Sequence, residues 1–296
     1  MKNKVVKVSL VLAMFILLLG VATLFDLSIA KAFASANLDI IVTIGSLGKL
    51  PAYLGLVFGF MCVYSGVEFR FKKIWFIWCL KIATAVCVFV SFGLTIDYVF
   101  NIGLVVSMII ALPFSVVAVC LVEKFKNKFN ALFYFGIMLI GVVVLSAVLI
   151  EGLKLIWCRE RPYMLIEAND YSSFTSWFRP MLFTDTRTSE YLVSRGIESS
   201  EWWGLDGFMS MPSGHAGMVA TIFAICYLPK FVSINKKYSW VLYTLSILLT
   251  VFVCFSRVVG LMHYLSDVVM GVAITLISLV FVYFITMIIK KHMFKE

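Results

Sequence analysis

The amino-acid sequence predicts an all-α membrane protein, a polytopic bundle of about eight transmembrane helices. Hydrophobic residues make up 62% of the 296 residues and charged residues 14%, whereas soluble domains average about 45–50% and about 25%. The mean hydropathy of the chain is +1.02. The apolar residues also gather in long runs with little or no charge, and a helix needs about 20 such residues to cross the hydrocarbon core of a bilayer.

Eight of these runs follow one another along the chain. Seven of them reach the roughly 17–25 residues of a spanning helix. The sixth run is shorter and reaches a workable length only if its helix begins near Ser213. In order, the runs cover residues 8–25, 50–67, 74–94, 98–122, 129–150, 216–228, 238–255 and 268–289.

The first run follows basic residues, as the apolar core of a secretory signal does. Its core is longer than the roughly 7–15 residues of such a signal. The small residues that would suit cleavage, around Ala36, come well after it. We therefore expect an uncleaved first span.

Basic residues predict the orientation of the chain. Short cytoplasmic loops carry an excess of Lys and Arg, and clusters of these residues fall at the N-terminus, in alternate loops and at the C-terminus. Both termini are therefore expected in the cytoplasm, and the longest connection, residues 154–212, outside the plasma membrane. The same distribution accounts for the net charge of +9, so we expect the lipid bilayer as a partner and no nucleic acid. The clusters are Lys2/Lys4/Lys7, Arg70/Lys72/Lys73, Lys124/Lys126/Lys128, Lys230/Lys236/Lys237 and Lys290/Lys291/Lys295.

The long outer connection is rich in aromatic residues, which favour the membrane–water boundary. We expect it to lie on the outer leaflet, either as an interfacial anchor or as a lid over the lipid tail of a ligand. Its aromatic residues are Tyr171, Phe174, Trp177, Phe178, Phe183, Tyr191, Trp202, Trp203 and Phe208.

Cysteine usage points to buried thiols. All but one of the seven cysteines lie in the apolar runs, and only Cys158 falls in an outer segment. The sequence therefore predicts neither a disulfide framework nor a metal site built from Cys and His.

Three polar clusters interrupt the apolar pattern, and the expected topology places all three on the outer side. The first runs from Lys154 to Arg161 and Pro162. On a helix, Lys154 and Arg161 would lie two turns apart on one face, and Pro162 disfavours the helical conformation at Arg161. Lys with Arg suits a phosphate, because a guanidinium forks onto phosphate oxygens. Boundary charges that bind lipid headgroups are the alternative.

The second cluster is Pro212-Ser213-Gly214-His215, at the start of the sixth run. Ser213 is a strong helix cap, and the N–H groups of a helix start attract anions. Gly214 lets the backbone approach a ligand closely, and His215 would lie in the first turn beside that ligand. An ordinary cap next to a boundary histidine is the alternative.

The third cluster contains Ser256, Arg257, His263 and Asp267. His263 and Asp267 are four positions apart, so on a helix the carboxylate would lie next to the imidazole. A carboxylate hydrogen-bonded to one ring nitrogen fixes the tautomer and leaves the other nitrogen poised for reaction. An acid at the start of a membrane span also needs a partner. A purely structural His–Asp pair is the alternative.

Together the clusters would supply two Arg, one Lys, a hydroxyl, a helix start, two His and one Asp on one side of the membrane. This set suits nucleophilic attack on an anion of phosphate size and protonation of a leaving oxygen. It contains no group of carboxylates for magnesium, so we expect metal-free chemistry and no cofactor. Arg159, Glu160 and a second Arg-Pro, at Arg179 and Pro180, are not expected to be catalytic.

The motifs KxxxxxxRP, PSGH and SRxxxxxHxxxD, which extend from Lys154 to Asp267, resemble the signature of the type 2 phosphatidic acid phosphatase superfamily. That superfamily includes membrane lipid phosphatases and is related to vanadium haloperoxidases. The resemblance implies that His263 is the nucleophile, that Asp267 orients it, and that His215 is the general acid. It further implies a phosphate-binding role for Lys154, Arg161, Ser213, Gly214 and Arg257.

Lipid phosphatases of this superfamily usually have six spans, with the first motif after the third. Here the first motif follows the fifth run, so the resemblance implies a six-helix phosphatase core with an extra N-terminal pair of helices. Residues 1–100 would then hold N-terminal transmembrane helices that are partly additional to the family core. Residues 101–296 would form the phosphatase core, with the outer loop at 154–212.

The expected function is hydrolysis of a lipid phosphate or pyrophosphate at the extracytoplasmic face, through a phosphohistidine intermediate. Undecaprenyl pyrophosphate, phosphatidylglycerophosphate, phosphatidic acid and lipid A phosphates are all candidate substrates. Phosphoryl transfer to a sugar or lipid alcohol, and binding or transport of a lipid phosphate without catalysis, are the alternatives. The sequence determines neither the lipid nor the oligomeric state.

Overall fold

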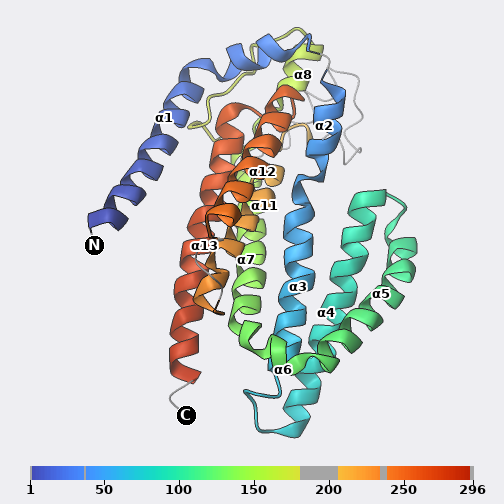
Figure 1. Cartoon of the computed structure of the whole chain (residues 1–296). Helices are drawn as coiled ribbons and strands as arrows, with labels where there is room; N and C mark the ends of the chain where they lie inside the picture. Colours follow the sequence, from blue (N-terminus) through green and yellow to red (C-terminus); the bar gives the residue numbers. More distant parts are fainter. Residues whose placement is uncertain (1, 37, 181–205, 234–238, 294–296) are drawn as a thin grey trace. The chain divides into compact units, whose positions relative to one another are not determined.

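Every regular element is helical in the part of the chain that the structure describes (Figure 1). The structure is a computed structural model and describes residues 2–36, 38–180, 206–233 and 239–293. The α-helices are α1 (Lys2–Phe33), α2 (Asp39–Gly45), α3 (Leu50–Gly66), α4 (Ile74–Phe100), α5 (Leu104–Lys124), α6 (Lys126–Phe129), α7 (Phe133–Trp157), α8 (Pro162–Glu167), α11 (Gly214–Ala220), α12 (Ser239–Val259) and α13 (Leu265–Met293). The 3-10 helices are η1 (Ser46–Lys49), η2 (Asn130–Leu132) and η3 (Thr221–Lys230).

Within the described residues, 7 helical stretches are long and apolar enough to cross a membrane. They lie close to the expected runs, so the predicted fold class is confirmed: the chain is an all-α, multi-pass membrane protein. The stretches are Ser9–Phe33, Asp39–Gly66, Ile74–Phe100, Leu104–Lys124, Lys126–Glu167, Ser239–Val259 and Leu265–Met293.

The expected sixth span takes a different form. Residues 216–228 fall in α11 and η3, which have 7 and 10 residues, so neither element has the length of a spanning helix. The change to tighter turns begins at Thr221, whose hydroxyl donates to the carbonyl of Met218 at 2.7 Å. Such back-bonding to the preceding turn often bends a helix.

The chain forms two compact units. All three motifs belong to unit 1, together with α1 and α2. The division at residue 100 that the family resemblance implies stays a prediction. Unit 1 consists of Met1–Ser46, Ala147–Gly217 and Val251–Ile274, and unit 2 of Leu47–Ser146, Met218–Thr250 and Thr275–Glu296.

In unit 1, the N-terminal helices pack against the segments that carry the motifs. Helix α1 lies against α8, and Ala30 of α1 is buried in one apolar cluster with Leu165 and Tyr264. Helix α2 lies against the end of α12, where a Cβ on Gly45 would come 1.7 Å from Ser256 Oγ. Only a glycine permits that approach, so the sequence is adapted to hold α2 against motif 3.

The described aromatic residues of the outer connection also pack within unit 1. Tyr171 and Phe174 join the apolar cluster around Tyr264. The indole N–H of Trp177 donates to Thr23 Oγ1 in α1 at 2.8 Å. Their expected role as an anchor or lid stays a prediction, and four of the residues named for it, Phe183, Tyr191, Trp202 and Trp203, lie outside the described residues.

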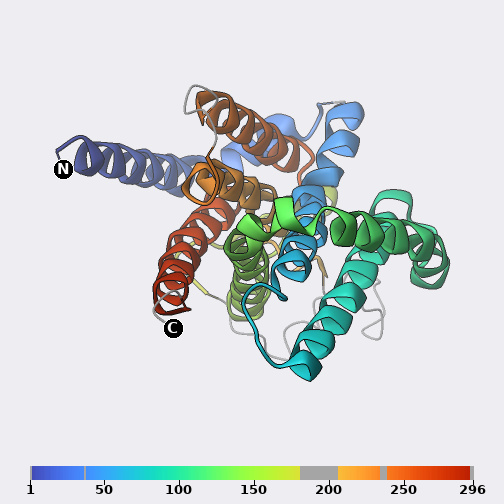
Figure 2. The ribbon, with the colours of Figure 1, turned by 60° about the horizontal axis from the view of Figure 1, so that its bottom comes forward.

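In unit 2, α4 packs along both α3 and α5 (Figures 1 and 2). Lys81, a charge inside α4, is 4% exposed and ion-paired to Glu68 and, at 2.8 Å, to Glu123. Lys126 binds the same two carboxylates at 2.6 and 2.7 Å. Two Lys and two Glu therefore compensate one another, which makes the charge within the span tolerable.

Candidate active site

The first motif bends where α7 ends. Lys154 lies in the last turn of α7, which ends at Trp157. Cys158 then has a φ of 42°, a value that is rare for a non-glycine residue and that takes the chain out of the helix. Arg161 is extended, with φ −73° and ψ 148°, as Pro162 predicts. The expectation that Lys154 and Arg161 share one helix face is therefore wrong, because the helix ends before it reaches Arg161.

Both cations of the first motif are buried, and each is paired with an exposed carboxylate. Lys154 Nζ lies 3.0 Å from Glu151 Oε1, and the Glu151 side chain is 58% exposed. Arg161 donates from Nη2 to Asp206 Oδ1 at 2.7 Å and from Nε to the Asp206 carbonyl at 2.8 Å. The Asp206 side chain is 61% exposed. Both carboxylates reach water, so they are hydrated again when they leave, and an anion that enters the site can displace them.

The second motif opens α11 and is fixed to the third. Gly214 is the first residue of α11, and the N–H of Ala216 donates to Ser213 Oγ at 3.4 Å, the capping contact that the sequence predicts. The N–H of Ser213 donates to the carbonyl of Asp267 at 2.9 Å. A Cβ on Gly271, one turn further along α13, would lie 2.4 Å from the Ser213 carbonyl oxygen, so a glycine is required there.

The third motif places its histidine and aspartate differently from the sequence expectation. His263 precedes α13, which begins at Leu265, so His263 and Asp267 do not share a helix. His263 Nδ1 lies 3.9 Å from Asp267 Oδ2 but 2.6 Å from the carbonyl oxygen of Ser210. A backbone carbonyl therefore takes the place of the carboxylate as the partner of this ring nitrogen.

Arg257, the other cation of the third motif, lies in the last turn of α12. Its side chain is buried, and Nη2 donates to the carbonyl of Val42 in α2 at 2.8 Å. Helix α2 therefore orients this guanidinium.

The Ser210 carbonyl fixes the tautomer of His263. A carbonyl can only accept a hydrogen bond, so Nδ1 carries the hydrogen and Nε2 keeps its lone pair. The pKa of the His263 imidazole lies well below its usual range, first because burial disfavours the charged form. Positive charge on Arg161, His215 and Lys154 acts in the same direction. His263 is thus a neutral imidazole with a nitrogen that can act as a nucleophile.

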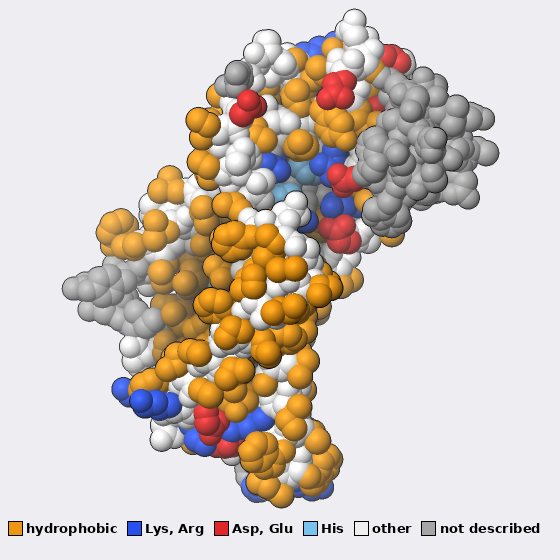
Figure 3. All heavy atoms as spheres, turned by 90° about the vertical axis from the view of Figure 1, so that its right-hand side faces the viewer, with side chains coloured by type: hydrophobic (Ala, Val, Ile, Leu, Met, Phe, Trp, Pro, Cys, Tyr) orange, Lys and Arg blue, Asp and Glu red, His pale blue; other side chains and the backbone are white. Residues whose placement is uncertain are grey.

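Direct contacts show that the fold brings the motifs together. Arg161 Nη1 of the first motif lies 3.8 Å from Met262 Sδ, within the third motif, and the N–H of Ser213 of the second donates to the carbonyl of Asp267 of the third at 2.9 Å. Figure 3 shows histidine atoms among Lys and Arg side chains, with Asp and Glu side chains beside them. All the site residues expected from the sequence, including Ser213, Gly214, Arg257 and Asp267, belong to unit 1.

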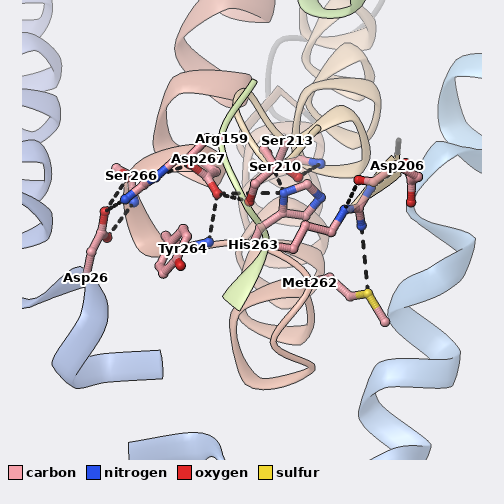
Figure 4. Close-up of polar contacts among 12 residues, drawn as sticks. Asp26, Arg159, Asp206, Ser210, Ser213, Met262, His263, Tyr264, Ser266 and Asp267 are labelled. Carbon is pink, nitrogen blue, oxygen red and sulfur yellow. Dashed lines mark hydrogen bonds and ion pairs between the residues drawn. The ribbon is translucent and has the colours of Figure 1, made fainter. Parts of the chain in front are cut away.

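Two side chains that no motif singles out bind the Asp267 carboxylate, together with the N–H of Tyr264 at 2.9 Å, and a third side chain binds one of the two (Figure 4). Its Oδ2 accepts from Ser210 Oγ at 2.5 Å, and its Oδ1 accepts from Arg159 Nη1 at 2.7 Å. Arg159 also donates from Nη2 to Asp26 Oδ2 in α1 at 3.0 Å. One signal for Asp26 was present in the sequence: the apolar pattern resumes after it, and an acid inside a span needs a partner.

The family model of the PAP2 superfamily matches residues 131–290, a range that contains all three motifs. No curated protein and no solved structure matches the chain. Since the family match covers more than half of the chain, the protein belongs to the PAP2 (type 2 phosphatidic acid phosphatase) superfamily.

Proposed function

We propose that the protein is an integral membrane phosphatase that hydrolyses a lipid phosphate or pyrophosphate through a phosphohistidine intermediate. Membership of the PAP2 superfamily supports phosphatase activity. The observation that carries the mechanism is the imidazole of His263, whose Nδ1 is bound to the Ser210 carbonyl at 2.6 Å and whose charged form is disfavoured. A neutral imidazole with its lone pair on Nε2 is the form that attacks phosphorus.

In the first step, Nε2 of His263 forms a bond to phosphorus while the bond between phosphorus and the leaving oxygen breaks. His215 acts as the general acid and gives its proton to that oxygen. Lys154 and Arg161 bind the remaining phosphoryl oxygens and stabilise the charge of the transition state. Ser213, Gly214 through its N–H, and Arg257 complete the proposed phosphate-binding set.

In the second step, water attacks the phosphohistidine. The bond between Nε2 and phosphorus breaks, and its electron pair returns to His263. His215, which has lost its proton, takes one from the attacking water. Inorganic phosphate leaves, and both histidines are back in their starting states.

The position of the site supports an amphiphilic substrate. Lys154 lies at the end of α7, Arg257 at the end of α12 and Asp267 at the start of α13. These helices are long and apolar enough to span the membrane. A site at helix ends can receive a phosphorylated headgroup while the lipid tails stay in the bilayer. Undecaprenyl pyrophosphate, phosphatidylglycerophosphate, phosphatidic acid and lipid A phosphates all have this chemistry.

The orientation proposed for the site follows from the basic clusters of the sequence. Lys and Arg at both termini and in alternate loops favour cytoplasmic termini. The connection that carries Arg161 and Ser213 then lies outside. The proposed activity is therefore at the extracytoplasmic face of the plasma membrane.

The test is a phosphate-release assay on the detergent-purified protein, with a panel of these lipid phosphates and a chelator present. We expect release by the wild type and a loss of at least about 10³-fold in His263→Asn, because removal of a nucleophile leaves only binding and electrostatic stabilisation. His292→Asn is the matched control, since His292 is exposed in the last turn of α13 and should leave the rate unchanged.

Each other outcome has a definite meaning. A wild type as inactive as His263→Asn on every lipid, but able to bind the lipids, would replace the hydrolase by a lipid-phosphate binding protein. Phosphate release that depends on an added sugar or lipid alcohol would favour a phosphotransferase. An acid-labile, alkali-stable phosphoryl label on the wild type that His263→Asn lacks would support the phosphohistidine.

A further inference from the structure

A chain of buried polar contacts leads from the first helix to the aspartate of the third motif (Figure 4). Asp26 in α1 is 3% exposed, Arg159 1% and Asp267 0%. The Arg159 guanidinium lies between the two carboxylates, with Nη2 3.0 Å from Asp26 Oδ2 and Nη1 2.7 Å from Asp267 Oδ1. The Ser266 hydroxyl joins them by donating to Asp26 Oδ2 at 2.5 Å and accepting from Arg159 Nη1 at 2.7 Å.

Arg159 is held on its other sides as well. Its Nε donates to the carbonyl of Thr175 at 2.9 Å. Its guanidinium carbon lies 4.0 Å from the centre of the Tyr264 ring and 5.6 Å from that of Phe174, within the range of a cation–π interaction. With all three nitrogens bonded and two rings beside it, the guanidinium has little freedom to turn.

The contacts continue from Asp267 to the proposed nucleophile. Asp267 Oδ2 accepts from Ser210 Oγ at 2.5 Å. The carbonyl of the same Ser210 accepts the Nδ1 hydrogen of His263 at 2.6 Å. The contacts therefore link the imidazole to Ser210 and Ser210 to Asp267, whose Oδ2 also accepts from the N–H of Tyr264 at 2.9 Å. Arg159 binds the other carboxylate oxygen, Oδ1, and its carbonyl accepts from the N–H of Ser210 at 3.0 Å.

We propose that Asp26 and Arg159 are positioning residues that fix Asp267, and through Ser210 the tautomer and orientation of His263. This inference rests on the proposed function, in which His263 is the nucleophile. Asp26 lies in α1, outside the residues 131–290 that match the family. The N-terminal helix thus contributes a positioning residue, Asp26, to the proposed active site, in addition to its role as a membrane span.

Asp26 is needed because one guanidinium is shared by two buried carboxylates. Asp26 accepts from Arg159 and twice from Ser266, through the hydroxyl and, at 3.1 Å, through the N–H. Without the Asp26 carboxylate, Arg159 Nη2 and Ser266 both lose acceptors in a buried place. Each can then move, and Asp267 loses the fixed orientation that the contacts to Ser210 require.

The direct test is the kinetics of Asp26→Asn and Arg159→Gln in the purified full-length protein. Neither residue belongs to the proposed phosphate-binding set, so we expect kcat to fall about 10–100-fold, as a misplacement of about 1 Å does, with KM within about 3-fold of the wild type. Arg159→Lys keeps a charge and should lose less than Arg159→Gln. The controls Asp39→Asn and Arg179→Gln change exposed residues of the same unit and should keep the wild-type kcat.

The double variant distinguishes one connected chain from two separate defects. If Asp26 acts through Arg159, the variant that carries both Asp26→Asn and Arg159→Gln should be no slower than Arg159→Gln alone. Losses that multiply would show independent damage and would contradict the proposal.

The pH profile distinguishes positioning from a simple loss of folded protein. The charges of Lys154, Arg161 and His215 act on His263, and Asp267 Oδ2 lies 3.9 Å from His263 Nδ1. Arg159→Gln removes a positive charge, so His263 is protonated more easily and the acid limb of kcat/KM should move to higher pH. Asp26→Asn removes a negative charge and should move that limb to lower pH. Loss of folded protein alone would lower the profile without moving it.

Two further measurements apply if a charge variant does not fold or the wild type does not turn over. Ser266→Ala keeps every charge and should lower kcat about 3–10-fold. Orthovanadate, which adopts the five-coordinate geometry of phosphoryl transfer when a nucleophile binds it, reports on His263 without turnover. We expect Asp26→Asn to bind vanadate about 10-fold more weakly than Asp39→Asn, measured by the shift of the melting temperature with vanadate concentration.

The outcomes separate the two proposals. An active wild type with full kcat in Asp26→Asn and Ser266→Ala would overturn the positioning role and leave the proposed function standing. A wild type that binds vanadate but releases no phosphate would refute hydrolysis, and equal vanadate affinity in Asp26→Asn and Asp39→Asn would then also refute positioning. A wild type that neither binds vanadate nor releases phosphate would refute both the proposed function and the positioning role.

Discussion

At the scale of single residues, the proposed chemistry depends on the imidazole of His263, which its surroundings keep neutral. Burial lowers the pKa of His263, and the nearby charges of Arg161, His215 and Lys154 lower it further. The same cations that would bind a phosphate therefore also disfavour protonation of the proposed nucleophile. The acid limb of activity should consequently lie below the usual pKa of a histidine, about 6.5.

Replacement of Lys154 by Gln tests this double role. Loss of a positive charge favours the protonated imidazole, so the pKa of His263 should rise and the acid limb of kcat/KM should move to higher pH. Lys291→Gln, which changes an exposed lysine in the last turn of α13, should leave the limb in place. The measurement is kcat/KM against pH for the three proteins. An acid limb of kcat/KM that is unchanged or moves to lower pH in Lys154→Gln would show that Lys154 does not act on His263.

Arg161 is hydrogen-bonded to Asp206 in the structure, with Nη2 donating to Oδ1 at 2.7 Å. A substrate phosphate has to displace this carboxylate, so Asp206→Asn should lower KM. Only the carboxylate of this pair is exposed, so we take the upper end of the range for exposed pairs, about 1 kcal/mol, which corresponds to a decrease in KM of about 5-fold. Glu167→Gln, another exposed carboxylate of unit 1, is the control. A higher KM in Asp206→Asn would show that Asp206 orients Arg161 and does not compete with the substrate.

At the scale of elements, the site depends on the close approach of α11 to α13. A Cβ on Gly271 would lie 2.4 Å from the Ser213 carbonyl oxygen and 3.2 Å from the N of Gly217. The backbone of the second motif therefore rests directly on α13, one turn after Asp267. Any side chain at position 271 would push Ser213 and the neighbouring His215 away from the third motif.

Gly271→Ala should therefore lower both stability and activity. Overpacking of this kind costs about 1–3 kcal/mol, and a shift of about 1 Å in reacting groups lowers kcat about 100-fold. Gly152→Ala in α7 is the matched control, because a Cβ there meets nothing within 4 Å and alanine favours a helix by about 1 kcal/mol over glycine. Thermal unfolding and kcat of both variants check this. Wild-type values in Gly271→Ala would mean that α11 and α13 can separate without loss.

At the scale of the whole molecule, the basic clusters predict the side of the membrane on which each connection lies. Ser172, an exposed residue between α8 and the second motif, should be outside, and Asn127, exposed in α6, inside. The experiment uses Ser172→Cys and Asn127→Cys in a background without the exposed thiols Cys79 and Cys120. A membrane-impermeant maleimide should label Ser172→Cys in intact cells and Asn127→Cys only after permeabilisation. The reverse pattern would place the proposed active site in the cytoplasm.

The sequence by itself determined the all-helical membrane fold and the identity of the residues in the three motifs. Hydropathy is a local property, and a spanning helix satisfies its backbone hydrogen bonds within its own segment. The spans could therefore be placed without knowledge of their neighbours. The exception is residues 216–228, where the helix changes from α-helical to 3-10 turns at Thr221. The motif residues were recognisable because their spacing lies within short stretches of chain.

Only the tertiary structure decided what holds the proposed nucleophile. The helix predicted to join Lys154 to Arg161 ends at Trp157. The ring nitrogen of His263 that was expected to bind Asp267 is hydrogen-bonded to the Ser210 carbonyl instead. Asp26 is hydrogen-bonded to Arg159, which is 133 positions away in the sequence, and to Ser266, which is 240 positions away. Contacts at such separations depend on how the helices pack, and no local pattern of residues encodes that packing.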